Sequence, residues 1–232
     1  MCELLLVRWS RPEPFSRSLG WALELERLGV AGFGWGVAWL EDGRVRVEKD
    51  PGRLGDDEGA QARLAGLASD RFLVHLRRPS QLSTVSIHDT QPFVASGFAF
   101  CHNGTFARHR ELRPRFEERL LGHADSEVGF RLFEELLGDA EPAAALERTH
   151  RELGGDANLA YLGEDGTLVA YNGHDHNDLW TFELDGAEVA ATALHSADTS
   201  LFDLVFTGAT NRLRLRGEAA ALEQPQDVGA GR

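Results

Sequence analysis

The chain has 232 residues, of which 42% are hydrophobic, and its formal net charge is −13. This length can bury the core of one large domain or two small ones. A nucleic-acid-binding surface needs clustered lysine and arginine, and here the basic residues are scattered through an acidic chain. No apolar stretch approaches the ~20 residues of a membrane span, and the N-terminal segment is too short for a secretory signal. These features predict a cytoplasmic protein that binds neither nucleic acid nor membrane.

Strands and helices are expected to alternate along the first half of the chain. Residues 2–8 predict an apolar strand, which Pro12 and Pro14 separate from a helix over roughly 15–28. The elements that follow are a hairpin over 34–50 around Asp42-Gly43, a helix over 58–69, and strands over 71–77 and 98–104.

The second half is expected to hold two helices and then a run of strands. Asp125 begins a helix to about Leu137, and a second helix covers about 141–153. The strands that follow are predicted over 158–165, 166–172, 179–186 and 187–194, and alternating arginines over 212–216 indicate one solvated strand face. We expect a single domain of mixed strands and helices over residues 1–216, followed by a polar tail over 217–232 that frays.

Cys2, directly behind Met1, is the first candidate for chemistry. If Met1 is removed, Cys2 holds both a thiol and a free α-amine, whose pKa of about 7.7–8.0 lets it accept the thiol proton near neutrality. On position alone, the ordinary interpretation is a half-buried strand residue. Cys101 and His75 are expected to be buried structural residues, and two cysteines make no disulfide framework.

Three further positions suit binding and catalysis. Arg77 ends a predicted strand and can present its planar guanidinium to a carboxylate, although a surface arginine is the ordinary alternative. Asn103 offers an amide donor and Gly104 an unobstructed backbone N–H, a pair that forms either an oxyanion hole or a plain turn. Asp125 opens an acidic first helical turn, for which N-capping is the ordinary explanation.

The order of these residues resembles that of the class II glutamine amidotransferases, in particular their short stand-alone branch. The shared motifs span roughly residues 1–137 and are Met1-Cys2, Gly-Trp-Gly (34–36), His-Leu-Arg (75–77), Asp-Thr-Gln-Pro-Phe (89–93), His-Asn-Gly (102–104) and Ala-Asp-Ser-Glu (124–127). The resemblance implies an α+β fold of the N-terminal-nucleophile hydrolase type, a four-layer αββα sandwich of two antiparallel sheets.

The resemblance also implies how the residues would act. Cys2 would be the nucleophile with its own amine as general base, and Asn103 and Gly104 would hold the tetrahedral oxyanion. Ammonia would then leave, and water would release glutamate from a γ-glutamyl thioester. No metal or other cofactor is implied.

Substrate binding is expected from four residues. Arg77 would bind the α-carboxylate of glutamine and Asp125 its α-ammonium, so each charge of the amino-acid head group meets its opposite. Ser80, which stands where the family commonly has threonine, and Trp35 of the Gly-Trp-Gly motif complete the set.

Three departures from the family pattern surround this site. Arg78 stands where an aromatic residue or glutamine is usual, Gln91 where histidine is usual, and Ala-Gly-Phe (31–33) where a polar Asn-Asp often occurs. These changes leave the catalytic parts intact, and they put the identity of the substrate in doubt more than the chemistry.

Two other short motifs, a possible metal site and a glycosylation sequon, are weaker evidence for function. His174-Asp175-His176 supplies at most two metal ligands and is expected to be a solvated loop. The sequon Asn-Gly-Thr (103–105) is set aside because nothing indicates secretion.

The favoured function is a glutaminase, because the head-group pair is complete. Its ammonia would pass to a separate synthase partner, which would explain a lone glutaminase domain. A γ-glutamyl amide hydrolase that acts on a larger metabolite is the alternative. A non-catalytic regulatory or binding module is a third interpretation, against which the intact site residues argue.

Overall fold

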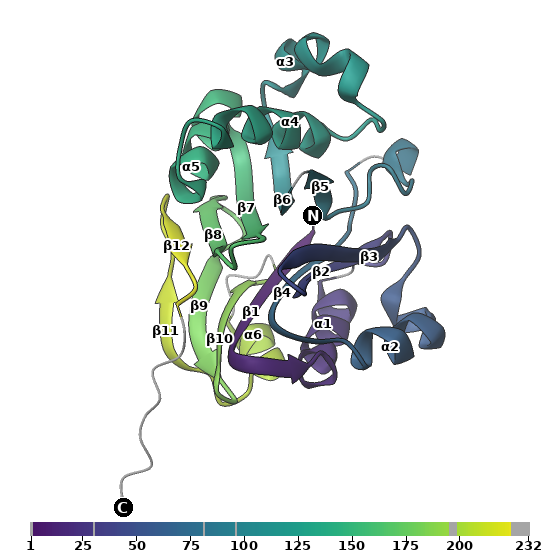
Figure 1. The fold of residues 1–232 in the computed structure, drawn as a ribbon, viewed down its shortest axis with the longest axis vertical. Helices are drawn as coiled ribbons and strands as arrows, with labels where there is room; N and C mark the ends of the chain where they lie inside the picture. The colour runs from purple at the N-terminus through teal and green to yellow at the C-terminus, as the bar shows by residue number, and fades with distance from the viewer. Residues whose placement is uncertain (1, 30, 81, 96, 195–198, 224–232) are drawn as a thin grey trace, which may run out of the picture.

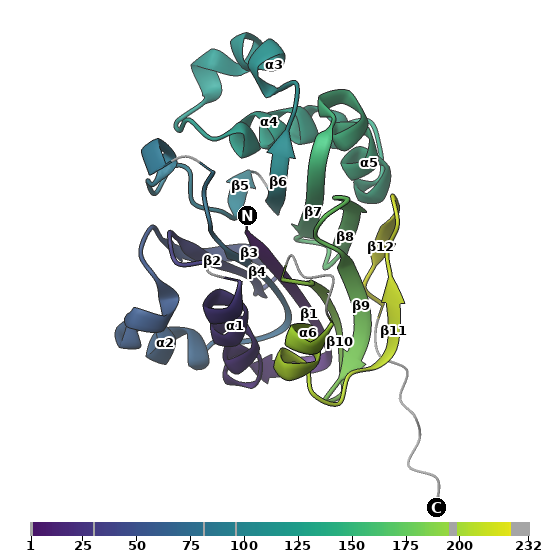
Figure 2. The same cartoon turned by 180° about the vertical axis from the view of Figure 1, so that it is seen from behind.

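The computed structural model describes residues 2–29, 31–80, 82–95, 97–194 and 199–223. Two β-sheets pack face to face, and helices cover the outer side of each sheet (Figures 1 and 2). Every strand pair in both sheets is antiparallel, which confirms the predicted α+β class. Within the described ranges, no helix is long and apolar enough to cross a membrane.

The larger sheet has seven strands, among them the first strand of the chain. In sheet order they are β11 (Thr210–Arg214), β9 (Leu179–Leu184), β10 (Ala187–Thr192), β1 (Glu3–Pro14), β4 (Ala68–Leu76), β2 (Trp35–Glu41) and β3 (Arg44–Asp50). Strand β1 is longer than predicted, because its register shifts after Arg8 and pairing with β4 resumes at Glu13. Pro12 and Pro14 therefore lie within the last, irregular part of β1, and not in a separate segment between the strand and the helix.

The smaller sheet has five strands, in the order β12 (Ala219–Ala221), β8 (Leu168–Gly173), β7 (Gly155–Gly163), β6 (Phe98–Phe106) and β5 (Phe93–Ala95). The prediction of a frayed tail is wrong for the start of that segment. Strand β12 pairs with β8, and Leu222 is buried in the core between the sheets. The rest of the predicted tail, from residue 224 onward, lies outside the described residues.

Two helix layers complete the sandwich. One covers the seven-stranded sheet with α1 (Ser16–Leu28), α2 (Glu58–Ala65) and α6 (Ser200–Val205), and the other covers the five-stranded sheet with α3 (His109–Phe116), α4 (Asp125–Leu137) and α5 (Pro142–Leu153). Short 3-10 turns occur at η1 (Leu54–Asp56), η2 (Leu82–Thr84) and η3 (Glu117–Arg119). The predicted four-layer order is thus present.

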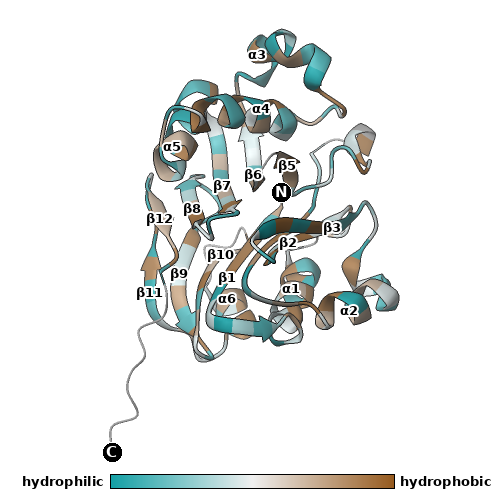
Figure 3. Ribbon diagram, in the orientation of Figure 1, coloured by the Kyte–Doolittle hydropathy of each residue, from teal (hydrophilic) through white to brown (hydrophobic). Residues whose placement is uncertain are grey.

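Leucines and small side chains fill the space between the sheets. Ala38, Ala99 and Ala160 belong to this central cluster, and so does Cys101, which is fully buried as predicted. His75 is also fully buried. Hydrophobic residues mark the strands, whereas α3 is mostly hydrophilic (Figure 3). The small residues let the two sheets approach closely, which brings strand ends from both sheets to one place.

Most predicted elements occur with shifted ends. The hairpin over 34–50 is confirmed, and its turn residues Asp42 and Gly43 both have positive φ, as a two-residue hairpin loop requires. The helix predicted over 58–69 ends at Ala65, because the next residues already lead into β4. Helix α3 was not predicted, since Pro114 inside it disfavours a helix.

Glu3 predicts a measurable pH dependence of stability. Its carboxyl is fully buried, accepts a hydrogen bond from the Thr192 hydroxyl, and has its pKa raised to about 7 by burial. The unfolded chain loses this proton near pH 4.3, so the free energy of unfolding falls as pH rises from there through 7. Glu3→Gln should remove that fall. The free energy of unfolding of the variant, relative to that of the wild type, should therefore rise by roughly 3 kcal/mol between pH 4 and 8. Urea unfolding of both proteins across this range is the measurement, and a constant difference between them would contradict the burial argument.

Candidate active site

The strand register brings the N-terminal cysteine to the centre of the fold. Glu3 of β1 pairs with Leu76 of β4, so Cys2 lies beside Arg77. From the facing sheet, Asn103 of β6 reaches the same point, and the backbone N–H of Cys2 donates to its Oδ1 at 3.0 Å. This contact joins residues that are 101 positions apart. The predicted nucleophile and oxyanion residue are therefore neighbours.

The Cys2 thiol sits at the edge of a cavity. The backbone N–H of Arg78 donates to its Sγ at 3.4 Å. Burial raises the pKa of the Cys2 thiol, and the Arg78 N–H and the Arg77 charge act in the opposite direction. Because the net direction is upward, the thiol needs a nearby base to become a nucleophile near neutrality.

The amide of Asn103 is oriented by its neighbour. Asn103 is fully buried, and because Oδ1 accepts from Cys2, Nδ2 is the free end of the amide. This Nδ2 has no hydrogen-bond partner among the described residues. Gly104 has φ +142°, and a Cβ there would lie 1.9 Å from the Asp156 carbonyl oxygen, so only glycine fits. A buried donor without a partner, beside a thiol, is suited to a charge that forms during a reaction.

Arg77 is a buried cation with one free end. Its side chain is 3% exposed, and Nη2 donates to the Thr84 hydroxyl at 2.8 Å. Nη1 is buried without a partner in the described part of the chain. Burial lowers the pKa of Arg77, and the charges of Cys2, Asp89 and Asp125 act against this. The guanidinium is thus held in place with donors left for an anion.

Asp125 is the first residue of α4, as predicted, but it does not cap the helix. The N-cap is Ala124, and Asp125 Oδ2 instead accepts the Phe106 N–H at 2.8 Å. Oδ1 has no hydrogen-bond partner among the described residues, and Asp125 lines the same cavity as Cys2 and Arg77. The carboxylate is therefore anchored through one oxygen and presents the other.

Asp89 does the capping that sequence reasoning did not assign to it. Its Oδ1 accepts the N–H groups of His123 and Ala124, both at 2.7 Å, and its Oδ2 accepts the Ser86 hydroxyl. Glu127 binds the N–H groups of residues 121 and 122 in the same way. Two buried carboxylates thus fix the loop that leads to Asp125. The Asp-Thr-Gln-Pro-Phe motif was the available signal, because it begins with Asp89.

The side-chain amide of Gln91 binds both backbone groups of His102. Its Oε1 accepts the His102 N–H at 2.6 Å, and its Nε2 donates to the His102 carbonyl at 3.1 Å. The Gln91–Pro92 peptide is cis, and Lys49 Nζ donates to the carbonyls on either side, of Thr90 and Pro92. Lys49 thus fixes the backbone on both sides of Gln91, and Gln91 in turn fixes His102, the residue before Asn103.

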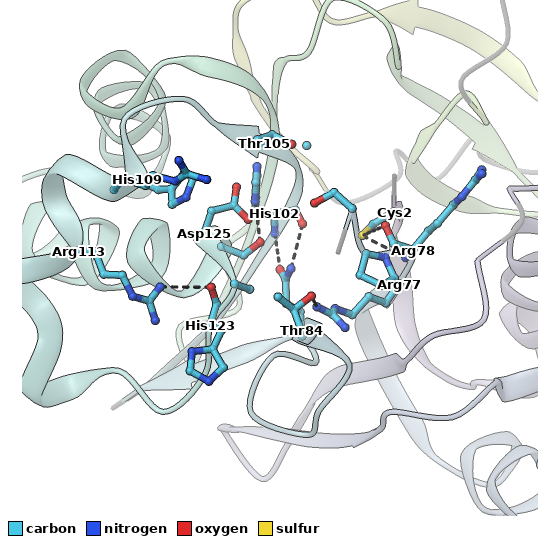
Figure 4. A pocket seen from close by; sticks show the side chains of 17 residues that line it. Cys2, Arg77, Arg78, Thr84, His102, Thr105, His109, Arg113, His123 and Asp125 are labelled. Atoms are coloured by element: carbon cyan, nitrogen blue, oxygen red, sulfur yellow. Dashed lines mark hydrogen bonds between the residues drawn. The ribbon is translucent and has the colours of Figure 1, made fainter. Parts of the chain in front are cut away.

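The cavity has a volume of about 430 Å³, and Figure 4 shows its lining. The predicted residues that line it are Cys2, Arg77, Ser80, Gly104 and Asp125. Asn103 lies directly behind Cys2. The expectation that Trp35 contacts substrate is not met, because Trp35 is 1% exposed, packs in the core beneath α1 and α2, and does not line the cavity.

The predicted loop at 174–176 is solvated only in part. Asp175 and His176 are exposed, but His174 is buried, and its Nδ1 accepts the N–H groups of His176 and Asn177. No group of three metal-ligating side chains occurs in the part of the chain that the structure describes.

Comparison with known proteins agrees with this geometry. A family model described as glutamine amidotransferases class-II matches residues 1–189. The chain belongs to the class II glutamine amidotransferases. An uncharacterized protein of Methanocaldococcus jannaschii, MJ1515, is 37% identical over 84 residues, which are 34% of this chain and 23% of that protein.

Solved structures share the fold at low identity. Glutamine phosphoribosylpyrophosphate amidotransferase from B. subtilis has a TM-score of 0.67 at 18% identity, over 96% of this chain and 46% of that one. A glutamine aminotransferase class-II domain protein from Silicibacter pomeroyi has a TM-score of 0.60 at 17% identity, over 96% and 99%. A predicted glutamine amidotransferase from Pseudomonas aeruginosa has a TM-score of 0.53 at 18% identity, over 95% and 97%. The chain thus spans less than half of the B. subtilis enzyme and nearly all of the two short proteins, and its fold is the N-terminal-nucleophile hydrolase type.

Gly36 of the Gly-Trp-Gly motif gives a test of how the site is packed. A Cβ at Gly36 would lie 2.2 Å from the Gln91 carbonyl oxygen, so Gly36→Ala must displace the Gln91–Pro92 segment. We expect a loss of about 1–3 kcal/mol in the free energy of unfolding. Gly20→Ala in α1 is the matched control, because nothing lies within 4 Å of its Cβ, and it should be neutral or stabilising. Equal stability of the two variants in urea unfolding would refute the packing argument.

Proposed function

We propose that this protein hydrolyses the side-chain amide of glutamine through a thioester on Cys2. The observation that carries this proposal is the contact between Cys2 and Asn103, which sets a buried amide donor without a described partner beside the residue whose thiol lines the cavity. Arg77 and Asp125 line the same cavity and supply the charges that a free amino acid requires.

The chemistry follows from the atoms at this point. With Met1 removed, the nitrogen of Cys2 is a free amine on the residue that carries the thiol, and it accepts the thiol proton. The thiolate attacks the amide carbon, and the oxyanion is stabilised by Asn103 Nδ2 and the Gly104 N–H. The amine returns its proton to the leaving nitrogen, so ammonia departs and a γ-glutamyl thioester remains. Water, deprotonated by the same amine, releases glutamate and the thiol.

Substrate orientation is assigned to the head group. The free Nη1 of Arg77 binds the α-carboxylate, and Oδ1 of Asp125 accepts from the α-ammonium. Ser80 is exposed at the cavity and offers a hydroxyl, whereas Trp35 is assigned no contact with substrate. The γ-amide of a substrate held in this way reaches Cys2.

Two fates of the amine are compatible with this mechanism. In the first, the amine is ammonia, and it passes to a separate synthase partner. A second candidate, hydrolysis of a larger γ-glutamyl amide, is favoured by the open cavity of about 430 Å³. The complete set of site residues argues against a non-catalytic module.

Covalent labelling tests the nucleophile and the processing together. A diazoketone analogue of glutamine should add one adduct to the natively produced protein, and intact mass should show a chain that begins at Cys2. Cys101→Ser should label normally, because burial raises the pKa of Cys101 well above its ordinary value and keeps it inert. Cys2→Ser should not label, and its turnover should fall at least about 10³-fold. An active protein that retains Met1 would refute the mechanism.

Asn103→Ala separates transition-state stabilisation from binding. Removing Nδ2 should lower kcat by about 10²–10³ with a small change in KM, because this donor is needed most when the oxyanion forms. Steady-state kinetics with glutamine is the measurement. A rise in KM with unchanged kcat would assign Asn103 to substrate positioning instead.

A further inference from the structure

We infer that the cavity accepts γ-glutamyl amides whose departing amine carries an anionic group: a carboxylate, phosphate or sulfonate. This inference rests on the proposed function and names the substrate class of the same site. It comes from the charges that remain on the cavity wall once the amino-acid head group is bound.

The cavity is cationic although the chain is acidic. The whole chain has a net charge of −13, yet among the described lining residues Asp125 is the one carboxylate. The lining also holds four arginines and three histidines, namely Arg77, Arg78, Arg110, Arg113, His102, His109 and His123. With Arg77 and Asp125 occupied by the head group, every other formal charge on the described wall is positive. A concave wall of one sign attracts ligands of the opposite sign.

Within the α3 segment, the arginines that line the cavity differ from their neighbours in their ion pairs. Arg108 pairs with Glu111 and Arg115 pairs with Glu135. Arg110, three residues before Arg113 on the same helix face, has no ion pair in the described chain, and neither has Arg113. In this segment, carboxylates therefore pair with Arg108 and Arg115, which do not line the cavity, and not with Arg110 and Arg113, which do.

Arg113 is held as a fixed cation. Its Nη2 donates to the Gly122 carbonyl at 2.6 Å, and its Nη1 to the His123 carbonyl at 3.3 Å (Figure 4). These neutral acceptors orient the guanidinium but do not cancel its charge. The loop that supplies them is itself anchored by Asp89 and Glu127.

Arg78 adds a cation on the opposite side of the cavity, where its backbone lies beside the thiol and its side chain extends away from it (Figure 4). Its backbone N–H donates to Sγ of Cys2, and its exposed side chain has no ion pair among the described residues. A substituent on the amide nitrogen therefore meets a positive charge whether it extends past Arg78 or toward α3. Ammonia from glutamine would use none of these charges, whereas an anionic amine would use them during binding and attack.

Three γ-glutamyl amides of equal length test the inference. Their amines are 4-aminobutyrate, 4-aminobutanamide and 1,4-diaminobutane, which end in a carboxylate, a carboxamide and an ammonium. We expect kcat/KM for the carboxylate to exceed that for the carboxamide by about tenfold or more, and the ammonium to be the poorest substrate. The γ-glutamyl amides of phosphoethanolamine and ethanolamine repeat the comparison for a phosphate.

Variants locate the effect. Arg110→Gln should reduce the preference for carboxylate over carboxamide while the carboxamide itself is hydrolysed as before. Adding Arg78→Gln should reduce the ratio of the two kcat/KM values further, and this ratio is the readout because Arg78 also contacts the thiol. Arg108→Gln is the matched control on the same segment, because its side chain pairs with Glu111 and does not line the cavity. It should keep the full preference.

The outcomes separate the inference from the proposed function. Hydrolysis of glutamine and of all the amides, with carboxylate and carboxamide within about twofold of each other, would overturn the inference and leave the glutaminase chemistry intact. A carboxylate preference that persists in the Arg78 and Arg110 double variant would also overturn it. No turnover of any substrate by a chain that begins at Cys2 would refute the proposed function and, with it, the inference.

Discussion

The hydrogen bond between the Cys2 backbone and Asn103 is the contact on which the rest of the site depends. It links the first strand of one sheet to a central strand of the other, where the two sheets pack through leucines and small residues. The same bond decides which end of the Asn103 amide remains free. One interaction therefore fixes the backbone of the proposed nucleophile and the orientation of the proposed oxyanion donor.

The residues around this contact are held by buried polar groups rather than by the hydrophobic core. Asp89 and Glu127 each bind two consecutive backbone N–H groups in the loop before α4, and Gln91 binds both backbone groups of His102. Such bonds are directional, so they specify where the loops lie, whereas apolar packing specifies mainly that they are buried. Gly36 completes the arrangement, since its missing side chain lets the Gln91–Pro92 segment rest on β2.

Much of this arrangement could be predicted from the sequence because it is periodic or local. The strand expected over 71–77 and the helix expected from Asp125 both occur, as β4 and α4, and His75 is buried as predicted. The position of Trp35 was misjudged because a motif shows which residues occur together but not which face each one takes. In Gly-Trp-Gly, the glycines lie toward the site and the indole lies in the core.

Other features depended on distant partners and left little local signal. Strand β12 is short and alanine-rich, and it exists because the edge of β8 offers it a partner. Helix α3 contains Pro114 and few apolar residues, and it forms where Leu112 and Phe116 find the apolar cluster that α4 also lines. The cationic face of α3 was missed for the same reason, because its meaning depends on the cavity that it faces.

The hydrogen bonds of Lys49 have a consequence for how the state of the N-terminus can be read. Lys49 is the single lysine of the sequence, and its Nζ is engaged by two carbonyls while burial lowers its pKa. The one lysine side chain of this sequence is therefore occupied by hydrogen bonds to two carbonyls. A reagent that acylates amines in the native state reports almost entirely on the α-amine, and aldehydes that condense with a 1,2-aminothiol distinguish a terminal cysteine from a terminal methionine. Reagents of both kinds would therefore modify the chain selectively at its N-terminal residue, where the chemistry is proposed to occur.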